Sequence, residues 1–312
     1  MMDSIVVAIV AAVIIAYAIY ITVKYVRLVA NVFLNTTVSA PTLTHWKING
    51  QVVNFLSLDG TALKGLFVPH RAKRRGGGET IIFAHEVGAG LNSYEKYCAF
   101  LLDEGYNIFS FDFRGQHAEK NMHYNPTQWA SETEYYDLLG AIAYVEGRPD
   151  VDPERIGLFG ISRGATTCLC VVGGTPSIKA VVCDGAFSTK WTLEAYIRKW
   201  APIYFPKLFA QRLPYFFIAY LALLGRIASQ RKLGLKLLSL EWSLRQNLSV
   251  PVFVIHGERD SYIDSQHAKW LYERIRASKQ MWIVEGARHN EAVSLRPGEY
   301  RKRVASFVRE YV

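Results

Sequence analysis

Cysteine is scarce in this sequence, and its placement argues against a disulfide framework or a structural zinc site. The 312 residues include four cysteines. These are Cys98, Cys168, Cys170 and Cys183. They form no CxxC pair, and no histidine stands near them at the spacing of a zinc site. All but Cys98 lie in apolar runs, which favours buried free thiols and fits a reducing compartment. We expect no metal in this protein.

The sequence also lacks internal repeats, low-complexity tracts and an excess of acidic residues. Lys and Arg number 36 against 27 Asp and Glu, a formal net charge of +9. Half of the residues are apolar and 13% are aromatic. This composition excludes a disordered chain and predicts one substantial globular domain with apolar additions. The positive balance alone is compatible with nucleic acid or an anionic membrane as partner.

The amino-terminal part contains a long stretch without charge. Residues 4–23 carry no charged side chain, Asp3 precedes them, and Lys24 and Arg27 follow. As a helix, 20 residues span roughly 30 Å, the hydrocarbon thickness of a bilayer. The sequence therefore predicts a single transmembrane anchor with its juxtamembrane segment over residues 1–34. The positive-inside rule then places the remainder in the cytoplasm.

Two alternatives to an anchor remain open. A signal peptide normally carries positive charge before a shorter apolar run, and here the order is reversed. Nevertheless, the residues ending at Ala40 loosely resemble a cleavage site. The second alternative is a helix buried in the protein core.

From Gln51 onward, short apolar runs alternate with helical patterns, which is typical of an α/β sheet. Two β-rich runs, 52–57 and 63–69, flank a turn. Six further runs are predicted as parallel strands, namely 80–84, 107–111, 155–159, 179–183, 252–255 and 280–284. Helical patterns cover 93–104, 132–146, 163–172, 265–276 and 298–311. We assign 35–187 and 247–312 to one α/β core.

One interval, residues 188–246, interrupts this alternation. Its 59 residues hold ten Lys or Arg, two Glu and 11 aromatics. The local net charge is therefore +8, nearly all of the +9 of the chain. We predict a separate helical insertion here. It includes a 13-residue uncharged run between Arg212 and Arg226, which is too short to cross a bilayer and is typical of a buried or interfacial helix.

The strongest chemical signal is a serine flanked by glycines, with Gly160 and Gly164 two residues either side of Ser162. It follows a predicted strand and precedes a helical run, the context of a nucleophile elbow. Glycines at those places let the backbone segments approach closely. The following helix directs its first amides toward a developing oxyanion.

A serine nucleophile needs a histidine to take its proton and a carboxylate to orient that histidine. Asp260 follows the fifth predicted parallel strand, and His289 follows the sixth. Both lie where strands end, at the catalytic edge of a parallel sheet. Asp264 is the better helix-cap candidate and the alternative acid. The sequence therefore predicts the triad Ser162, Asp260 and His289.

These motifs resemble those of the α/β-hydrolase superfamily. The resemblance covers residues from about 51 to 311 and lies with the serine-hydrolase branch that includes monoacylglycerol lipases, aminopeptidase-like hydrolases and membrane-anchored α/β-hydrolase-domain proteins. It rests on the segments 82–85, 111–115, 160–164, 256–260 and 288–289. It implies an α/β-hydrolase fold with a mostly parallel sheet, in which the insertion 188–246 is a lid.

The resemblance also implies an oxyanion hole made by the backbone amides of Val87 and Arg163. This sequence departs from the family at Glu86, where a glycine is usual. We expect the Glu86 side chain to point away from the oxyanion, towards a loop arginine such as Arg114. Asp112 and Arg114 are expected to brace the loops around the elbow. For the Arg163 side chain, an ion pair is favoured over binding an anionic substrate group.

The sequence thus predicts a membrane-anchored serine hydrolase, without metal or organic cofactor, that cleaves a small or lipidic acyl ester. A peptidase or amidase with the same triad is one alternative. A catalytically inactive membrane-tethered scaffold is another, favoured only by Glu86. Membrane lipids are the expected partner of the basic, aromatic insertion, because no nucleic-acid-binding motif occurs. A lid that packs only on its own domain remains open.

Overall fold

The computed structural model describes residues 2–34, 50–70, 78–115, 127–246 and 249–312. It divides the chain into two compact units. The smaller unit joins Met1–Thr36 to Lys190–Leu235, and the larger unit joins Thr37–Thr189 to Lys236–Val312. The predicted domain bounds stay predictions, except that residues from Lys236 onward fall in the larger unit, before the expected end of the insertion at 246.

The larger unit is built on one eight-stranded sheet with the order β1-β2-β4-β3-β5-β6-β7-β8. The strands are β1 (Gln51–Leu56), β2 (Ala62–Val68), β3 (Thr80–Ala84), β4 (Asn107–Phe111), β5 (Ile156–Ile161), β6 (Ile178–Asp184), β7 (Val252–Gly257) and β8 (Lys279–Val284). β1 pairs with β2 and β2 with β4 in antiparallel fashion, and every later pairing is parallel. The predicted mostly parallel α/β sheet is confirmed.

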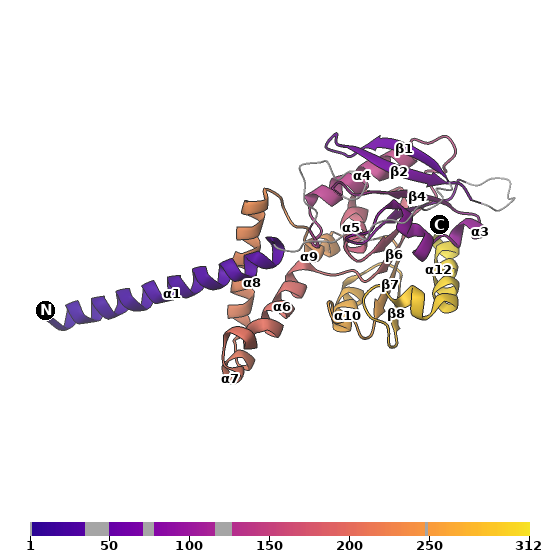
Figure 1. The fold of residues 1–312 in the computed structure, drawn as a ribbon. Helices are drawn as coiled ribbons and strands as arrows, with labels where there is room; N and C mark the ends of the chain where they lie inside the picture. The colour runs from indigo at the N-terminus through magenta and orange to yellow at the C-terminus, as the bar shows by residue number, and fades with distance from the viewer. Residues whose placement is uncertain (1, 35–49, 71–77, 116–126, 247–248) are drawn as a thin grey trace. The chain divides into compact units, whose positions relative to one another are not determined.

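Helices cover both faces of this sheet (Figure 1). They are α2 (Tyr94–Tyr97), α3 (Leu101–Glu104), α4 (Glu132–Glu146), α5 (Arg163–Val171), α9 (Leu240–Arg245), α10 (Ser265–Arg274), α11 (Ala292–Leu295) and α12 (Pro297–Tyr311). Consecutive residues of a strand enter opposite cores, since Leu158 packs with α4 and α5 residues whereas Phe159 packs with α12 residues. Burial on both faces explains why the parallel strands read as continuous apolar runs.

The helix predicted over 93–104 is wrong in its continuity. A 3₁₀ turn (Leu91–Ser93) leads into α2, and the chain leaves helical geometry at Cys98 before α3 begins. α3 then ends at Gly105 in the left-handed region, with φ +102°. The side chains Tyr94, Tyr97 and Leu101 are all buried. The break between α2 and α3 therefore lets both short helices bury their apolar side chains on the sheet. This packing stabilises them more than one longer continuous helix would.

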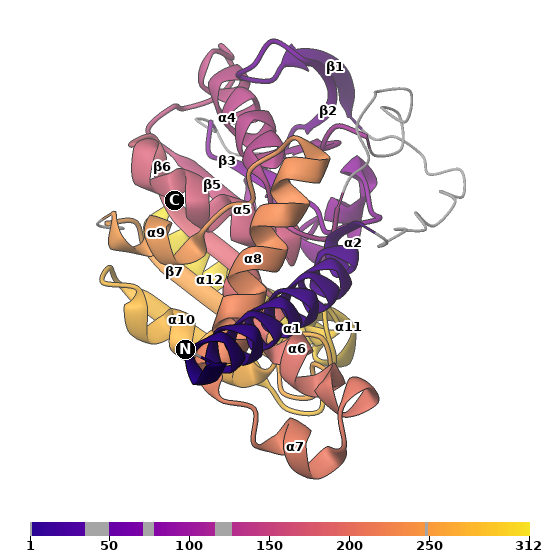
Figure 2. The ribbon, with the colours of Figure 1, turned by 90° about the vertical axis from the view of Figure 1, so that its left-hand side faces the viewer.

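The smaller unit contains α1 (Met2–Leu34), most of α6 (Thr189–Tyr204), α7 (Lys207–Gln211) and α8 (Tyr215–Leu233). α1 is long and apolar enough over Ile5–Val32 to cross a membrane, by length and composition. Figures 1 and 2 show α8 running across α1. By contrast, α9, which falls within the predicted insertion 188–246, lies in the larger unit and packs against α5.

Candidate active site

Ser162 lies in the sharp turn between β5 and α5. Its backbone φ is +53°, and it is one of two non-glycine residues with positive φ among those the structure describes. A side chain in this region is strained and needs a surrounding structure that imposes it. The Ser162 amide donates to the backbone oxygen of Asp184 over 2.7 Å, which ties the turn to the end of β6. The predicted strand–turn–helix context of the serine is therefore present.

The two flanking glycines are required by close backbone contacts. A Cβ atom on Gly164 would lie 2.1 Å from the backbone oxygen of Ala84, and one on Gly160 would lie 2.5 Å from Ala165 Cα. Both distances are far below van der Waals contact, so neither position tolerates a side chain. The glycine spacing in the sequence is thus the signature of α5 packed tightly on β3 and β5.

The three predicted triad side chains meet. Ser162 Oγ lies 2.9 Å from His289 Nε2, and His289 Nδ1 lies 2.6 Å from Asp260 Oδ2. The other oxygen of Asp260 accepts from the Tyr262 and Ile263 amides, each over 2.8 Å. Since an ionised carboxylate only accepts, Nδ1–H donates to Asp260, and Nε2 is left to accept the proton of Ser162.

The environment of Asp260 favours its ionised form. Burial acts to raise the pKa of Asp260, but the hydrogen bonds and charge of His289 and the Ile263 amide outweigh it, and the pKa lies below its usual value. Asp264, the alternative acid, instead caps α10, because its Oδ1 accepts from the Gln266 amide over 2.8 Å. The geometry therefore favours Asp260 over Asp264 as the partner of His289.

His256 is a site residue for which the sequence predicts no role. It is fully buried at the end of β7, and its Nε2 donates to the Ile263 oxygen over 2.8 Å. The same nitrogen lies 3.5 Å from Asp260 Oδ2. Burial lowers the pKa of His256, which favours the neutral ring. His256 thus fixes the loop that carries Asp260, a role that no sequence pattern distinguished from an ordinary strand end.

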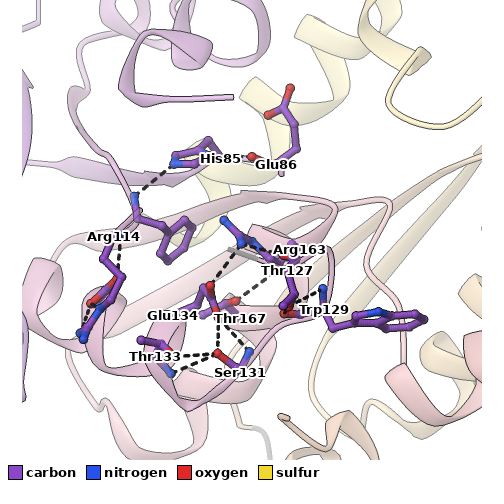
Figure 3. A network of polar contacts seen from close by, with 12 residues as sticks. His85, Glu86, Arg114, Thr127, Trp129, Ser131, Thr133, Glu134, Arg163 and Thr167 are labelled. Atoms are coloured by element: carbon purple, nitrogen blue, oxygen red, sulfur yellow. Dashed lines mark hydrogen bonds and ion pairs between the residues drawn. The ribbon is translucent and has the colours of Figure 1, made fainter. Parts of the chain in front are cut away.

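The loop after β3 carries Val87 and is held by His85. His85 Nε2 accepts from the Phe113 amide over 3.2 Å, and its Nδ1 donates to the Glu86 oxygen over 2.6 Å (Figure 3). Arg163, the first residue of α5, belongs to the helix turn whose amides have no partner within the helix. The use of the Val87 and Arg163 amides as an oxyanion hole stays a prediction.

The predicted pairing of Glu86 with Arg114 is wrong. Glu86 Oε1 accepts from the Tyr97 hydroxyl over 3.0 Å, and burial raises the pKa of Glu86. Arg114 instead binds Asp59 over 2.7 Å and Asp137 of α4. Asp137 is fully buried, so Arg114 neutralises a carboxylate that otherwise would be costly to bury. Arg114 therefore braces the loop after β4, as expected, but through α4.

The Arg163 side chain is not available to substrate. It is fully buried, its Nη1 donates to Glu134 over 3.1 Å and to the Thr127 oxygen over 2.9 Å, and its guanidinium lies 5.3 Å from the Phe113 ring centroid. Figure 3 shows this network around the start of α5, with Ser131 also bound to Glu134. Of the two alternatives from the sequence, the ion pair holds and the substrate-binding role does not.

Asp184 is a buried carboxyl behind Ser162. Its side chain is 1% exposed and accepts from the Tyr300 hydroxyl over 3.1 Å. Burial raises the pKa of Asp184 from 3.8 to about 7, despite the opposing bond from Tyr300. Between about pH 4 and pH 7 the folded protein therefore holds a proton that the unfolded chain releases, so this group makes stability fall as pH rises through that window.

We predict that Asp184→Asn removes this dependence. The gain in stability of the variant over the wild type should grow as pH rises from about 4 to about 7 and then level off. Urea unfolding of detergent-solubilised protein across that range measures the difference, with the exposed Glu310→Gln as control. A difference that stays constant with pH would show that Asp184 is ionised throughout.

Comparison with known proteins identifies the family. The description "Serine aminopeptidase, S33" matches residues 78–292, more than half of the chain. The chain belongs to this family. It is therefore an α/β-hydrolase of the esterase or peptidase type. The protein YfhR of Escherichia coli (strain K12) is 27% identical over 264 residues, covering 83% of this chain and 81% of YfhR.

Solved structures show the same fold. The esterase Pf2001 of Pyrococcus furiosus superposes with a TM-score of 0.64 at 21% identity, covering 88% of this chain and 98% of the esterase chain. The acylaminoacyl peptidase of Pyrococcus horikoshii gives 0.55 at 18% identity, covering 83% of this chain and 40% of the peptidase. At these identities the likeness concerns the fold alone.

Proposed function

We propose that this protein is a membrane-anchored serine hydrolase that cleaves an acyl ester, small or lipidic, through an acyl-enzyme. The observation that carries the proposal is the continuous chain of hydrogen bonds from Ser162 through His289 to Asp260. A serine hydroxyl is a weak nucleophile, and this arrangement supplies the base that activates it and the carboxylate that orients the base.

The proposed reaction has two halves. Ser162 Oγ bonds to the acyl carbon while its proton passes to His289 Nε2, and Asp260 stabilises the imidazolium. The Val87 and Arg163 amides stabilise the oxyanion. The carbon–oxygen bond to the leaving alcohol then breaks, and the alcohol takes the proton from His289. Water, deprotonated by His289, releases the acid and restores Ser162. The mechanism uses no metal or organic cofactor.

Esters and amides need the same triad, so the choice of ester rests on other features. The long apolar α1 and the aromatic insertion favour a substrate that partitions into a membrane. A peptidase or amidase is the second candidate, favoured by the family description and by the likeness to an acylaminoacyl peptidase. An inactive scaffold is disfavoured, because Glu86 is held by Tyr97 and the triad side chains remain in hydrogen-bond reach.

The experiment is a substrate panel on the full-length protein in detergent. Para-nitrophenyl esters of increasing acyl length and aminoacyl anilides are compared with Ser162→Ala as the blank. Ester turnover that rises with acyl length would support the lipidic ester. Serine-dependent turnover of the anilides in preference to the esters would instead establish the peptidase.

The anchor is tested by two added charges. The full-length protein should stay in the membrane during carbonate extraction, and Val10→Asp with Ile14→Asp should release it, since each charge at a helix centre costs about 2.5–3.5 kcal/mol. Val52→Asp with Leu56→Asp, at exposed positions of β1, is the matched control and should stay bound. Mature protein that begins after Ala40 would reveal a signal peptide instead.

A further inference from the structure

The exposed part of α1 ends where its apolar stretch ends. Every side chain from Ile5 to Tyr20 is exposed, and burial begins at Tyr25, which is 7% exposed. Val29 and Ala30 follow at 6% and 7%. Lys24, the first charge after the apolar stretch, stands between the two parts. The segment suited to lipid and the segment packed on protein are therefore consecutive.

The packed segment of α1 contacts α8 closely. A Cβ atom on Gly225 of α8 would lie 2.3 Å from Val29 Cγ1, so the two helices approach at a distance that only glycine permits. Ser229 Oγ lies 3.4 Å from the Ala30 oxygen. The Tyr25 ring stacks on Phe205, which follows α6, with centroids 4.9 Å apart. Thus α8 and the residue that follows α6 both take part in this contact.

The position of the contact along α1 fixes its depth in a bilayer. Val29 follows the end of the uncharged stretch by six residues, or about 9 Å of helix. The polar headgroup region extends roughly 5–8 Å beyond the hydrocarbon on each side. If α1 spans the membrane, α8 therefore meets it at the outer boundary of the headgroup layer. Both ribbon views show α8 crossing α1 and not continuing alongside it (Figures 1 and 2).

The exposed side chains of residues 190–235 are of the kinds that bind in the headgroup layer of a bilayer. Eight Lys or Arg and one Glu occur in this segment. Exposed apolar side chains accompany them, including Ile203 at 73%, Leu208 at 74% and Phe216 at 74%. Exposure of large apolar side chains to water is unfavourable. In an anionic leaflet these side chains can contact acyl chains, and the Lys and Arg side chains can bind lipid phosphates.

A groove of about 460 Å³ in the same unit has the same mixed character. α8 contributes Phe216, Tyr220 and Leu223 to its walls, and Leu193 of α6 faces them. Lys190, Glu194 and Arg226 also line it, and Lys190 Nζ lies 4.0 Å from Glu194 Oε1. Because Glu194 offsets the charge of Lys190, Arg226 is the cation beside these apolar walls that can bind the anionic headgroup of an acyl lipid.

We propose that α1, α6, α7 and α8 form one membrane-bound body, in which the insertion docks on the cytoplasmic end of the anchor and lies in the headgroup layer of an anionic leaflet. The proposal rests on the proposed anchoring of α1. The insertion is then held at the bilayer by the anchor, and its basic and apolar side chains bind anionic lipid there. In this arrangement α1 attaches the protein to the membrane and also holds the surface of α6, α7 and α8 against the leaflet.

Site-specific probes on the full-length protein test this surface. All four native cysteines are buried, so an environment-sensitive thiol probe will report introduced cysteines. Three variants are compared in liposomes containing lipid-borne quencher, namely Phe216→Cys in α8, Ile14→Cys in the anchor and Leu58→Cys in the larger unit. The probe at position 216 should be quenched nearly as strongly as that at 14, and far more strongly than that at 58.

Quenching of the probe at position 216 should depend on the charge of the lipid. Neutral liposomes or high salt should reduce quenching at position 216 and leave position 14 unchanged. Replacing Lys207 or Arg212 by Gln should each shift the docking equilibrium by roughly fivefold. Quenching at 14 but not at 216 would overturn the docked insertion and keep the anchor, whereas no quenching at either would overturn the anchor. Fluorophosphonate labelling of the same samples reports the hydrolase separately.

The helix contact has its own test. Cysteines at positions 30 and 229 should cross-link on mild oxidation, and Gly225→Leu should abolish the cross-link by forcing α8 off Val29. Gly298→Leu is the matched control, because a Cβ atom there meets nothing within 4 Å. A pair at 19 and 229 should not cross-link. Cross-linking that survives Gly225→Leu, or is absent without it, would refute the α1–α8 contact.

Discussion

Replacing Ser162 by alanine should abolish labelling by a fluorophosphonate and lower turnover by about 10⁴-fold or more, with the fold intact. The fluorophosphonate reacts only with a serine whose proton a base removes, and Ser162 Oγ lies 2.9 Å from His289 Nε2. Triad members act as a unit, so Asp260→Asn and His289→Ala should each cost on the order of 10⁴-fold in turnover. Activity-based gels and initial rates on the same membranes measure both effects.

Asp264→Asn is the matched control for the acid. Its side chain accepts only the Gln266 amide among the hydrogen bonds the structure describes for it, so Asn can replace it as a cap and activity should remain. Thermal unfolding of each variant checks that the fold survives. Full activity of Asp260→Asn together with loss in Asp264→Asn would move the acid to Asp264. Labelling that persists in Ser162→Ala would place the nucleophile elsewhere.

Replacing Arg163 by methionine should have the largest effect on stability, with a loss of about 3–5 kcal/mol, because it leaves the Glu134 carboxylate buried without its cation. Both side chains are at most 1% exposed. The Arg163 guanidinium also donates to the Thr127 oxygen and so ties the start of α5, next to Ser162, to the segment before α4. Labelling of Ser162 should therefore slow as well. Urea unfolding of detergent-solubilised protein measures the first effect, and the rate of fluorophosphonate labelling measures the second.

The double variant Arg163→Met with Glu134→Gln should recover part of that stability, because a neutral amide needs no buried cation and its oxygen can still accept from the Ser131 amide at the start of α4. Arg309→Met is the surface control, since the Arg309–Glu104 pair is exposed and such pairs contribute little. If Arg163→Met unfolds at the same urea concentration as the wild type, the buried pair is not a stabilising element of the elbow.

Local patterns in the sequence were sufficient for the sheet and for the candidate triad. The parallel strands inside the sheet, from β3 to β7, are buried on both faces, so each reads as a short apolar run whatever its neighbours are. The elbow is also local, because Gly160 and Gly164 are glycines on account of backbone contacts within and beside one turn. Asp260 and His289 could be chosen because residues that follow parallel strands gather at one edge of the sheet.

Side-chain partners across the fold could not be chosen in this way. Glu86 has Tyr97 as its partner and Arg114 has Asp137, because each side chain meets what the packing of α2 or α4 on the sheet brings to it. Arg163 reads as an accessible charge beside the nucleophile, yet it is fully buried against Glu134. His256 holds the Asp260 loop, although nothing in its neighbours along the chain distinguishes it from a strand end.

The sequence by itself determined the order of strands and helices, the elbow, the order of the candidate triad and the apolar character of α1, since each depends on residues close together along the chain. The tertiary structure alone decided which charges are buried in pairs, how the Asp260 loop is held, and that Gly225 of the insertion packs on Val29 of α1. These contacts join residues far apart in sequence, and burial makes each partner obligatory, because an unpaired charge or an empty contact inside the fold is costly.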